Sequence, residues 1–215
     1  MPSHTVHDQL LADARLDLDD DAIHVWRLPY RRQHGREPLL ALLAAYLGVT
    51  ASELRLVESE YGRPELAEPG KLSFNWSHCD DLAVVAIARG IAPGIDLERL
   101  RERPRALEIA HRYFTPGEAE ALAALDDASR SAAFLRLWTA KEAVLKALGR
   151  GIAFGLHRLH FGLDTTNTSL HWLDEDVAAH WQLHDLPIDA AHVATLAWRG
   201  AARRIERRGA LAATA

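Results

Sequence analysis

Apolar and polar side chains alternate along residues 22–28, which predicts a strand near the N-terminus. Over residues 37–47 apolar side chains recur at helical spacing, and Gly48 follows as a typical helix stop. The next 50 residues read as short strands separated by turns. Strands are predicted at 54–59, 72–76, 82–88 and 95–97, with breaks at 61–64 and 77–81.

The second half of the chain begins with two helical signals. Thr115, Pro116 and Glu118 have the spacing of an N-cap, a first helical residue and a capping-box acid. The strongest helical period covers about 129–148, and Gly149 ends it. Weaker strand signals follow at 158–163, 168–173, 179–186 and 192–198, and we expect the tail from Arg199 to be frayed or helical surface.

This order of elements predicts an α/β (α+β) protein. The length of 215 residues fits one large domain or two small ones. A leucine-rich helix and several strands occur in each part, so we expect two similar halves, 1–94 and 95–215. No internal sequence repeat supports this division.

Composition and charge narrow the class of protein. Apolar residues make up 48% and charged residues 26%, as in ordinary folded soluble proteins. The single cysteine, Cys79, excludes an internal disulfide framework and fits a reducing cytosol. No stretch has the pattern of a secretion leader or a membrane span, so we expect a cytoplasmic protein. The net charge of −5 gives no sign of nucleic-acid binding.

Charge gathers near both ends of the chain, with acids over residues 13–21 and arginines over 199–208. Solvated termini are the simpler explanation. A docking patch for an acidic partner is the alternative for the arginines.

Two short polar clusters stand out within the predicted elements. Asp96 and Glu98 alternate on a strand and therefore share one face. Glu142 and Lys146 lie one turn apart on the long helix. Each cluster alone is more typical of a solvent face. Together they would offer three hard oxygen ligands for Mg²⁺ and an ammonium for a phosphate, which favours an enzyme acting on a phosphoanhydride.

Several segments resemble, in the same order, the motifs of the 4′-phosphopantetheinyl transferases of the long, surfactin-synthetase-activating type. They are Tyr61-Gly62-Arg63-Pro64, Phe74-Asn75-Trp76-Ser77-His78, Gly94-Ile95-Asp96-Leu97-Glu98, Arg112-Tyr113-Phe114 with Glu118, and Trp138 with Lys141-Glu142-Ala143 and Lys146. Each motif alone is weak, but five in order over roughly residues 60–152 are specific.

The resemblance implies an enzyme that transfers the phosphopantetheine arm of coenzyme A to a serine of an apo carrier protein and releases 3′,5′-ADP. Asp96, Glu98 and Glu142 would hold Mg²⁺, with Mn²⁺ as an alternative. Glu142, or a water that it orients, would take the serine proton. Lys146 would bind the pyrophosphate.

The resemblance also implies contacts with coenzyme A. Ser77 and His78 resemble positions that meet its phosphates and adenosine, and residues 61–64, with Tyr61, Gly62, Arg63 and Pro64, resemble the loop against the adenine. For His78, a structural role is the default expectation from the residue alone. Lys141 points about 100° away from Glu142 around the helix, so it either reaches the phosphate or steadies a carboxylate.

The chain departs from the family pattern in two places. Arg63 stands where the family commonly has lysine. The first 60 residues match poorly, and Arg31, Arg32 and Arg36 are candidates there for the 3′-phosphate.

The resemblance further implies a monomer with the site between its two halves. The competing functions are a non-catalytic coenzyme A-binding protein and a magnesium-dependent phosphohydrolase. Intact Asp96, Glu98, Glu142 and Lys146 argue against the first, and the matches at 61–64 and 74–78 argue against the second.

Overall fold

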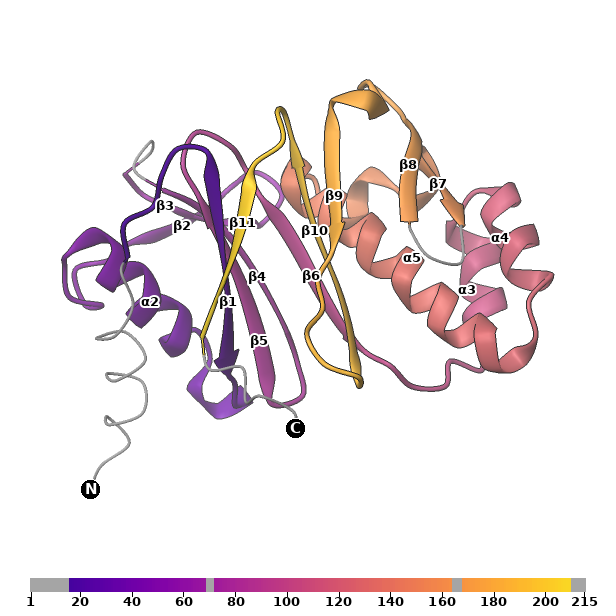
Figure 1. The fold of residues 1–215 in the computed structure, drawn as a ribbon, viewed down its shortest axis with the longest axis horizontal. Helices are drawn as coiled ribbons and strands as arrows, with labels where there is room; N and C mark the ends of the chain where they lie inside the picture. The colour runs from indigo at the N-terminus through magenta and orange to yellow at the C-terminus, as the bar shows by residue number, and fades with distance from the viewer. Residues whose placement is uncertain (1–15, 69–71, 164–167, 210–215) are drawn as a thin grey trace.

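The computed structural model describes residues 16–68, 72–163 and 168–209. Two β-sheets and the helices that cover them form successive layers (Figure 1). The mixed α/β class predicted from the sequence is confirmed.

The first sheet contains residues from both ends of the chain. Its strands are β1 (Ala22–Pro29), β4 (Ser73–Cys79), β5 (Leu82–Ala88) and β11 (Arg204–Arg208), in the order β11-β1-β5-β4. Helix α2 (Glu37–Leu47) covers its outer face, after the short 3₁₀ turn η1 (Arg32–His34). A small hairpin, β2 (Leu56–Glu58) and β3 (Pro64–Leu66), follows this helix.

The second sheet has the order β6-β10-β9, formed by β6 (Gly94–Arg99), β10 (His192–Arg199) and β9 (Trp181–Asp185). Helix α5 (Asp127–Leu148) packs along β6 and β10. Beyond it lie α3 (Ala106–Tyr113), α4 (Pro116–Ala123) and the hairpin of β7 (Leu159–Leu163) and β8 (Thr168–Leu173). Short 3₁₀ turns η2 (Ile152–Phe154), η3 (Leu156–Arg158) and η4 (Ala178–His180) connect these elements.

Three clusters of buried apolar residues correspond to the layers. One lies between α2 and the first sheet, one between the two sheets, and one around α5. Strand β5 is the central case: all of its side chains are buried, because β1 and β4 flank it and both of its faces are covered. Residues 82–88 are accordingly apolar without interruption, as expected for a strand buried on both faces.

Local signals place the helix ends. The capping box at the start of α4 is present, because the Thr115 side chain accepts from the Glu118 amide and Glu118 accepts from the Thr115 amide. Gly48 and Gly149 end α2 and α5 in the left-handed conformation, as predicted. Asp126 caps α5, so this helix begins two residues before the predicted start.

The prediction of a frayed or helical tail is wrong. Residues 204–208 form β11, which pairs in parallel with β1 at the edge of the first sheet (Figure 1). The high charge of this segment hid the strand, although Lys and Arg are common on strands at a sheet edge. The division at residues 94 and 95 stays a prediction, and β11 shows that the chain returns to the first sheet after the second is complete.

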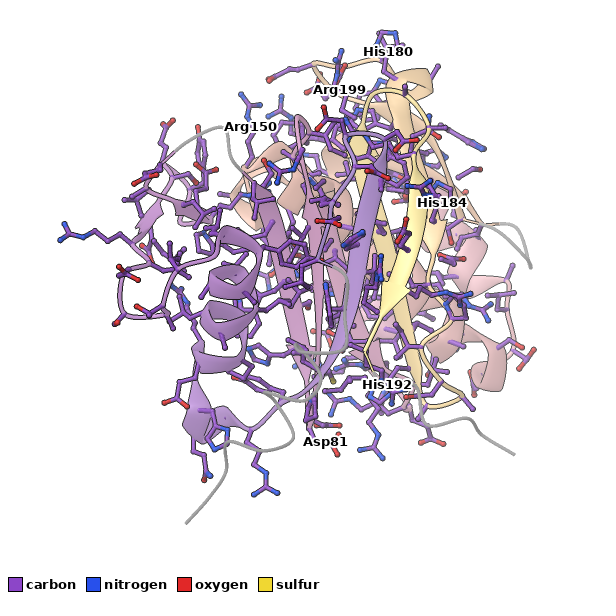
Figure 2. The ribbon with its side chains drawn as sticks, turned by 60° about the vertical axis from the view of Figure 1, so that its left-hand side comes forward. Asp81, Arg150, His180, His184, His192 and Arg199 are labelled. Carbon is purple, nitrogen blue, oxygen red and sulfur yellow. The ribbon has the colours of Figure 1, made fainter. Side chains whose placement is uncertain are left out.

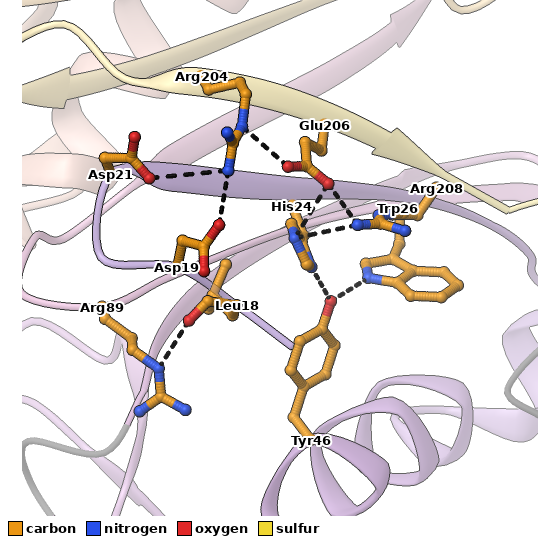
Figure 3. Close-up of polar contacts among 10 residues, drawn as sticks. All are labelled: Leu18, Asp19, Asp21, His24, Trp26, Tyr46, Arg89, Arg204, Glu206 and Arg208. Atoms are coloured by element: carbon orange, nitrogen blue, oxygen red, sulfur yellow. Dashed lines mark hydrogen bonds and ion pairs between the residues drawn. The ribbon is translucent and has the colours of Figure 1, made fainter. Parts of the chain in front are cut away.

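In this tail, Arg204 pairs with acids from the other end of the chain, and Arg208 pairs within the tail (Figure 3). Arg204 contacts Asp19, Asp21 and Glu206, and Arg208 contacts Glu206. Asp13 lies outside the described residues. Arg204 therefore links the two charged ends, while its side chain and those of Asp19 and Asp21 remain exposed to solvent.

The predicted break at 77–81 is also misplaced. Strand β4 continues to Cys79, which pairs with Leu82, and the turn occupies Asp80 and Asp81. Asp80 takes a positive φ of 54°, a conformation that aspartate tolerates better than most residues. The polar residues Ser77 and His78 thus belong to a strand.

Candidate active site

Gly94 lets β6 approach α5 closely enough to bring the two polar clusters together. A Cβ atom at this position would lie 2.0 Å from the Ala143 carbonyl oxygen and 2.5 Å from the Ala147 amide. Only glycine allows this backbone contact. Asp96, two residues along β6, therefore meets the Glu142–Lys146 face of α5.

Asp96 is the centre of the hydrogen bonding. Its Oδ1 accepts from the Lys146 Nζ at 2.7 Å and from the Ser77 Oγ at 2.9 Å. Lys146 also donates to the Ile95 carbonyl oxygen at 3.1 Å. Residues of β4, β6 and α5 thus meet in one place, which joins the first sheet to the second.

Asn75 fixes the relative position of β4 and β6. Its side chain is buried, and its Oδ1 accepts from the Ile95 amide at 2.9 Å. This bond satisfies a buried amide at the edge between the two sheets and aligns Ser77 with Asp96.

Glu142 has the most perturbed acidity of the group. Burial raises the pKa of Glu142 to about 7, and the carboxylates of Asp96 and Glu98 add to the rise while Lys146 opposes it. Burial also raises the pKa of Glu98, against the effect of Arg103. These carboxylates are close enough to repel one another, so the region favours a bound cation.

Two oxygen atoms of the cluster have unmet bonding capacity. Asp96 Oδ2 and Glu142 Oε1 are buried, and neither has a hydrogen-bond partner within the described residues. Such orphaned oxygens are rare in folded proteins unless an ion or water meets them. Within the described ranges, no three His, Cys, Asp or Glu side chains are already gathered as a ligand set. The oxygens fit a hard cation that takes further ligands from water and a substrate phosphate.

The Arg63 side chain is directed from its loop into the protein. Its guanidinium donates to the carbonyl oxygens of Lys146, Phe74 and Pro93 at 2.5, 3.0 and 3.1 Å. Burial lowers its pKa. Arg63 therefore ties the loop to the end of α5 and to β4.

The other residues of this loop occupy its turn. Tyr61 is half exposed, Gly62 has a φ of +78°, and Pro64 begins β3. Tyr61 is the side chain of the loop that is free to meet a ligand.

His78 lies in a group of aromatic rings that includes Tyr30, a residue that the sequence did not mark as part of the site. Its ring stacks on Tyr30 at a centroid distance of 4.1 Å, and Trp76 lies 5.1 Å away. Burial, Lys146 and Arg32 lower its pKa, in that order. Lys146 and Arg32 therefore both act on the His78 ring, whereas Arg36 lies 3.9 Å from Glu58. Tyr30 carries no motif that would reveal its role from the sequence.

The structure does not bring Lys141 to the site. This side chain is fully buried, and its Nζ meets Glu118 Oε1 at 2.8 Å and the carbonyl oxygens of Leu156 and Leu159. Lys141 is therefore not placed beside Asp96, Glu142 and Lys146, where the expected coenzyme contact would require it. Lys141 steadies a carboxylate instead, on the opposite side of α5 from Asp96.

Several arginines near the C-terminus pair with acids of the same chain, and a docking patch there stays a prediction. Arg199 pairs with Asp176 and lies with Arg150 and His180 at one end of the molecule, whereas Asp81 and His192 lie at the other (Figure 2). Arg150 pairs with Glu175. Arg199 and Arg150 therefore each have an acidic partner within the chain.

Among the described residues, no helix combines the length and apolar character needed to cross a membrane.

Comparisons with known proteins agree with this geometry. A family model described as the 4′-phosphopantetheinyl transferase superfamily matches residues 92–197, a range that includes Asp96, Glu98, Glu142 and Lys146. The 4′-phosphopantetheinyl transferase HetI of Nostoc sp. is 33% identical over an alignment of 230 residues that covers 90% of this chain and 94% of that protein.

Two further relatives cover less of their own length. The putative 4′-phosphopantetheinyl transferase slr0495 of Synechocystis sp. is 33% identical over 71% of this chain and 63% of that protein. The human L-aminoadipate-semialdehyde dehydrogenase-phosphopantetheinyl transferase is 29% identical over 77% of this chain and 60% of that protein. The chain thus spans less than two thirds of both.

Proposed function

Because the chain belongs to the 4′-phosphopantetheinyl transferase superfamily, a family of enzymes, we propose that it moves the 4′-phosphopantetheine group of coenzyme A to a serine of an apo carrier protein. The observation that carries this proposal is the meeting of Asp96, Glu142 and Lys146, with the Lys146 ammonium 2.7 Å from Asp96 Oδ1. The names of the relatives support the same class of reaction.

In the proposed reaction, the serine oxygen attacks the phosphorus that carries the pantetheine arm. The bond between this phosphorus and the bridging oxygen breaks, and 3′,5′-ADP leaves with that oxygen. The serine proton passes to Glu142, directly or through one water. The pKa of about 7 suits a general base, because such a group is partly deprotonated at neutral pH and still accepts a proton well.

Lys146 supports the departure of the leaving group. The Lys146 side chain is a quarter exposed, so its ammonium can meet a phosphate oxygen while it remains close to Asp96. A cation at this position offsets negative charge that develops on the pyrophosphate.

Asp96, Glu98 and Glu142 would together hold a divalent cation, which we propose to be Mg²⁺, with Mn²⁺ as a substitute. Such an ion would supply charge neutralisation at the pyrophosphate. The unpartnered oxygens Asp96 Oδ2 and Glu142 Oε1 support this assignment.

The coenzyme would extend from this cluster toward the first sheet. On that side lie Ser77, His78 and Tyr30, whose ring stacks on His78. Tyr61 of the 61–64 loop is exposed enough to contact the adenine. Arg63 would act by holding the loop. The proposal includes the expectation, drawn from the sequence, of a monomer in the cytoplasm.

The test is to incubate the protein with coenzyme A, Mg²⁺ and a set of apo carrier proteins, and to measure carrier mass. A gain equal to phosphopantetheine, with release of 3′,5′-ADP, supports the proposal. Coenzyme binding without any gain would point to a binding protein, and phosphate release without a carrier would point to a hydrolase.

A matched variant tests the role of Glu142. We expect Glu142→Gln to lower the transfer rate by about 10²–10⁴-fold, because the amide keeps the shape of the side chain but accepts no proton. Glu108→Gln is the control, since Glu108 is exposed and pairs with Arg105 on the surface. Near-normal transfer by Glu142→Gln would contradict the assignment.

A further inference from the structure

Arg103 forms an ion pair with Glu98, one of the proposed metal ligands. Its Nη2 donates to Glu98 Oε2 at 2.7 Å, and both side chains are about a quarter exposed. Arg103 lies in the segment between β6 and α3, five residues after Glu98. No motif in the sequence marks it.

The backbone of Arg103 is held independently of its side chain. Its amide donates to the Ser131 Oγ on α5 at 3.0 Å. The Arg103 backbone is therefore fixed, and its side chain can change rotamer without a movement of the segment.

The guanidinium also has an incomplete set of partners and room to move. Its Nε is buried without a hydrogen-bond partner in the described part of the chain. A groove of about 890 Å³ adjoins it, lined by residues that include Leu100, Glu102 and Arg130. Arg103 is thus poised between Glu98 and an open space.

A cation at Glu98 competes with this ion pair. Lys146 and Arg103 already place two positive charges beside Asp96, Glu98 and Glu142. A divalent ion on the Glu98 carboxylate would meet the guanidinium at close range, and like charges repel strongly where water is partly excluded.

We infer that Arg103 is a positioning residue that holds Glu98 in place of the metal and is displaced from it when a divalent cation binds. This inference rests on the proposed metal site. The pair keeps the Glu98 carboxylate directed and neutralised while the site holds no ion, and the groove beside it receives the guanidinium afterwards.

The experiment is a titration of the full chain with Mn²⁺ alone, in which free Mn²⁺ is followed by electron paramagnetic resonance. Wild type is compared with Arg103→Gln and Arg103→Ala. Arg105→Ala is the matched control, because Arg105 lies on the same segment but pairs with Glu108 on the surface. Circular dichroism and thermal unfolding establish that each variant is folded.

We expect both Arg103 variants to bind Mn²⁺ about tenfold more tightly than wild type, as removal of one partly screened competing charge predicts. Arg105→Ala should bind as wild type does, and Glu98→Gln should abolish the gain when combined with Arg103→Gln. Arg103→Gln serves if the alanine variant does not fold, because it keeps a polar hydrogen-bonding side chain without the positive charge.

Unchanged or weaker Mn²⁺ binding by folded Arg103→Gln would overturn the inference, as would an absence of Mn²⁺ binding in every variant. These results are distinct from failure of the proposed function, which is read from the carrier mass. A chain that modifies carriers with Mn²⁺ affinity unaffected by Arg103 would lose only this inference.

Discussion

Helix α5 carries two lysine–carboxylate pairs five residues apart, and they differ in how completely they are satisfied. Lys141 and Glu118 are both fully buried. The lysine makes two further bonds to carbonyl oxygens, and Glu118 accepts from the amides of Phe161 and Thr115. Every polar group of this pair therefore has a partner.

The pair between Lys146 and Asp96 is open by comparison. Lys146 is a quarter exposed, and Asp96 Oδ2 and the neighbouring Glu142 Oε1 have no hydrogen-bond partners among the described residues. A closed pair, in which every polar atom has a partner, specifies how elements pack. An open pair, which leaves oxygen atoms without partners, can still bind a ligand. The same residue types on one helix thus serve two purposes, and the difference lies in their surroundings.

The largest effect on stability is expected at the closed pair. Lys141→Met should lower the free energy of unfolding by about 3–5 kcal/mol, because it leaves the Glu118 carboxylate buried without a cation. Urea denaturation at neutral pH measures this loss. The double variant Lys141→Met with Glu118→Gln should recover much of it, and Lys146→Met should cost less than half as much. Equal losses at Lys141 and Lys146 would remove the distinction.

A smaller effect, of opposite sign, is expected at the open site. The pKa of Glu142 rises from 4.5 to about 7 on folding, so the folded state holds this proton more tightly than the unfolded state. Near pH 4.5 and below, Glu142 has little effect on the free energy of unfolding. Between pH 4.5 and about 7 the unfolded state loses this proton while the folded state keeps it, so the stability of the native protein falls. Above about pH 7 the carboxyl is ionised in both states, and the loss stays constant.

Glu142→Gln removes this cost. At pH 8, without divalent cations, we expect the variant to be about 3 kcal/mol more stable than wild type, and the difference should vanish near pH 4.5. Urea denaturation at both pH values measures it, with Glu108→Gln as an exposed control. A difference that does not change with pH would show that burial of Glu142 is not its cause.

The smallest effect is expected at a hydrogen-bonded group between α2 and β1, which contains none of the proposed site residues. The Tyr46 hydroxyl on α2 lies 2.5 Å from His24 Nδ1 and accepts from Trp26 Nε1 at 2.8 Å (Figure 3). Burial raises the pKa of Tyr46 to about 12, so the hydroxyl stays neutral at the pH of the measurement. Tyr46→Phe should cost about 1 kcal/mol in thermal unfolding and leave carrier modification unchanged. A loss of transfer would show that this network reaches the site.

Elements with a clear hydrophobic period could be predicted from the sequence. Strand β1 and helices α2 and α5 were expected close to their observed bounds, because one apolar face or a glycine stop marks each of them. Strand β11 and the end of β4 could not, since their polar side chains meet charges or the site rather than a core. Polar strands of this kind resemble loops when read alone.

For the candidate site, the sequence by itself determined the residue types and their order: Asp96 on one strand face, and Glu142 and Lys146 on one helix face. Only the tertiary structure decided which of them meet. Gly94 allows the contact between β6 and α5, Glu118 closes around Lys141, and Arg103 reaches Glu98. The physical reason is that periodicity fixes the direction of a side chain within its own element, whereas its partner can come from an element 50 or more residues away, as Asp96 does for Lys146.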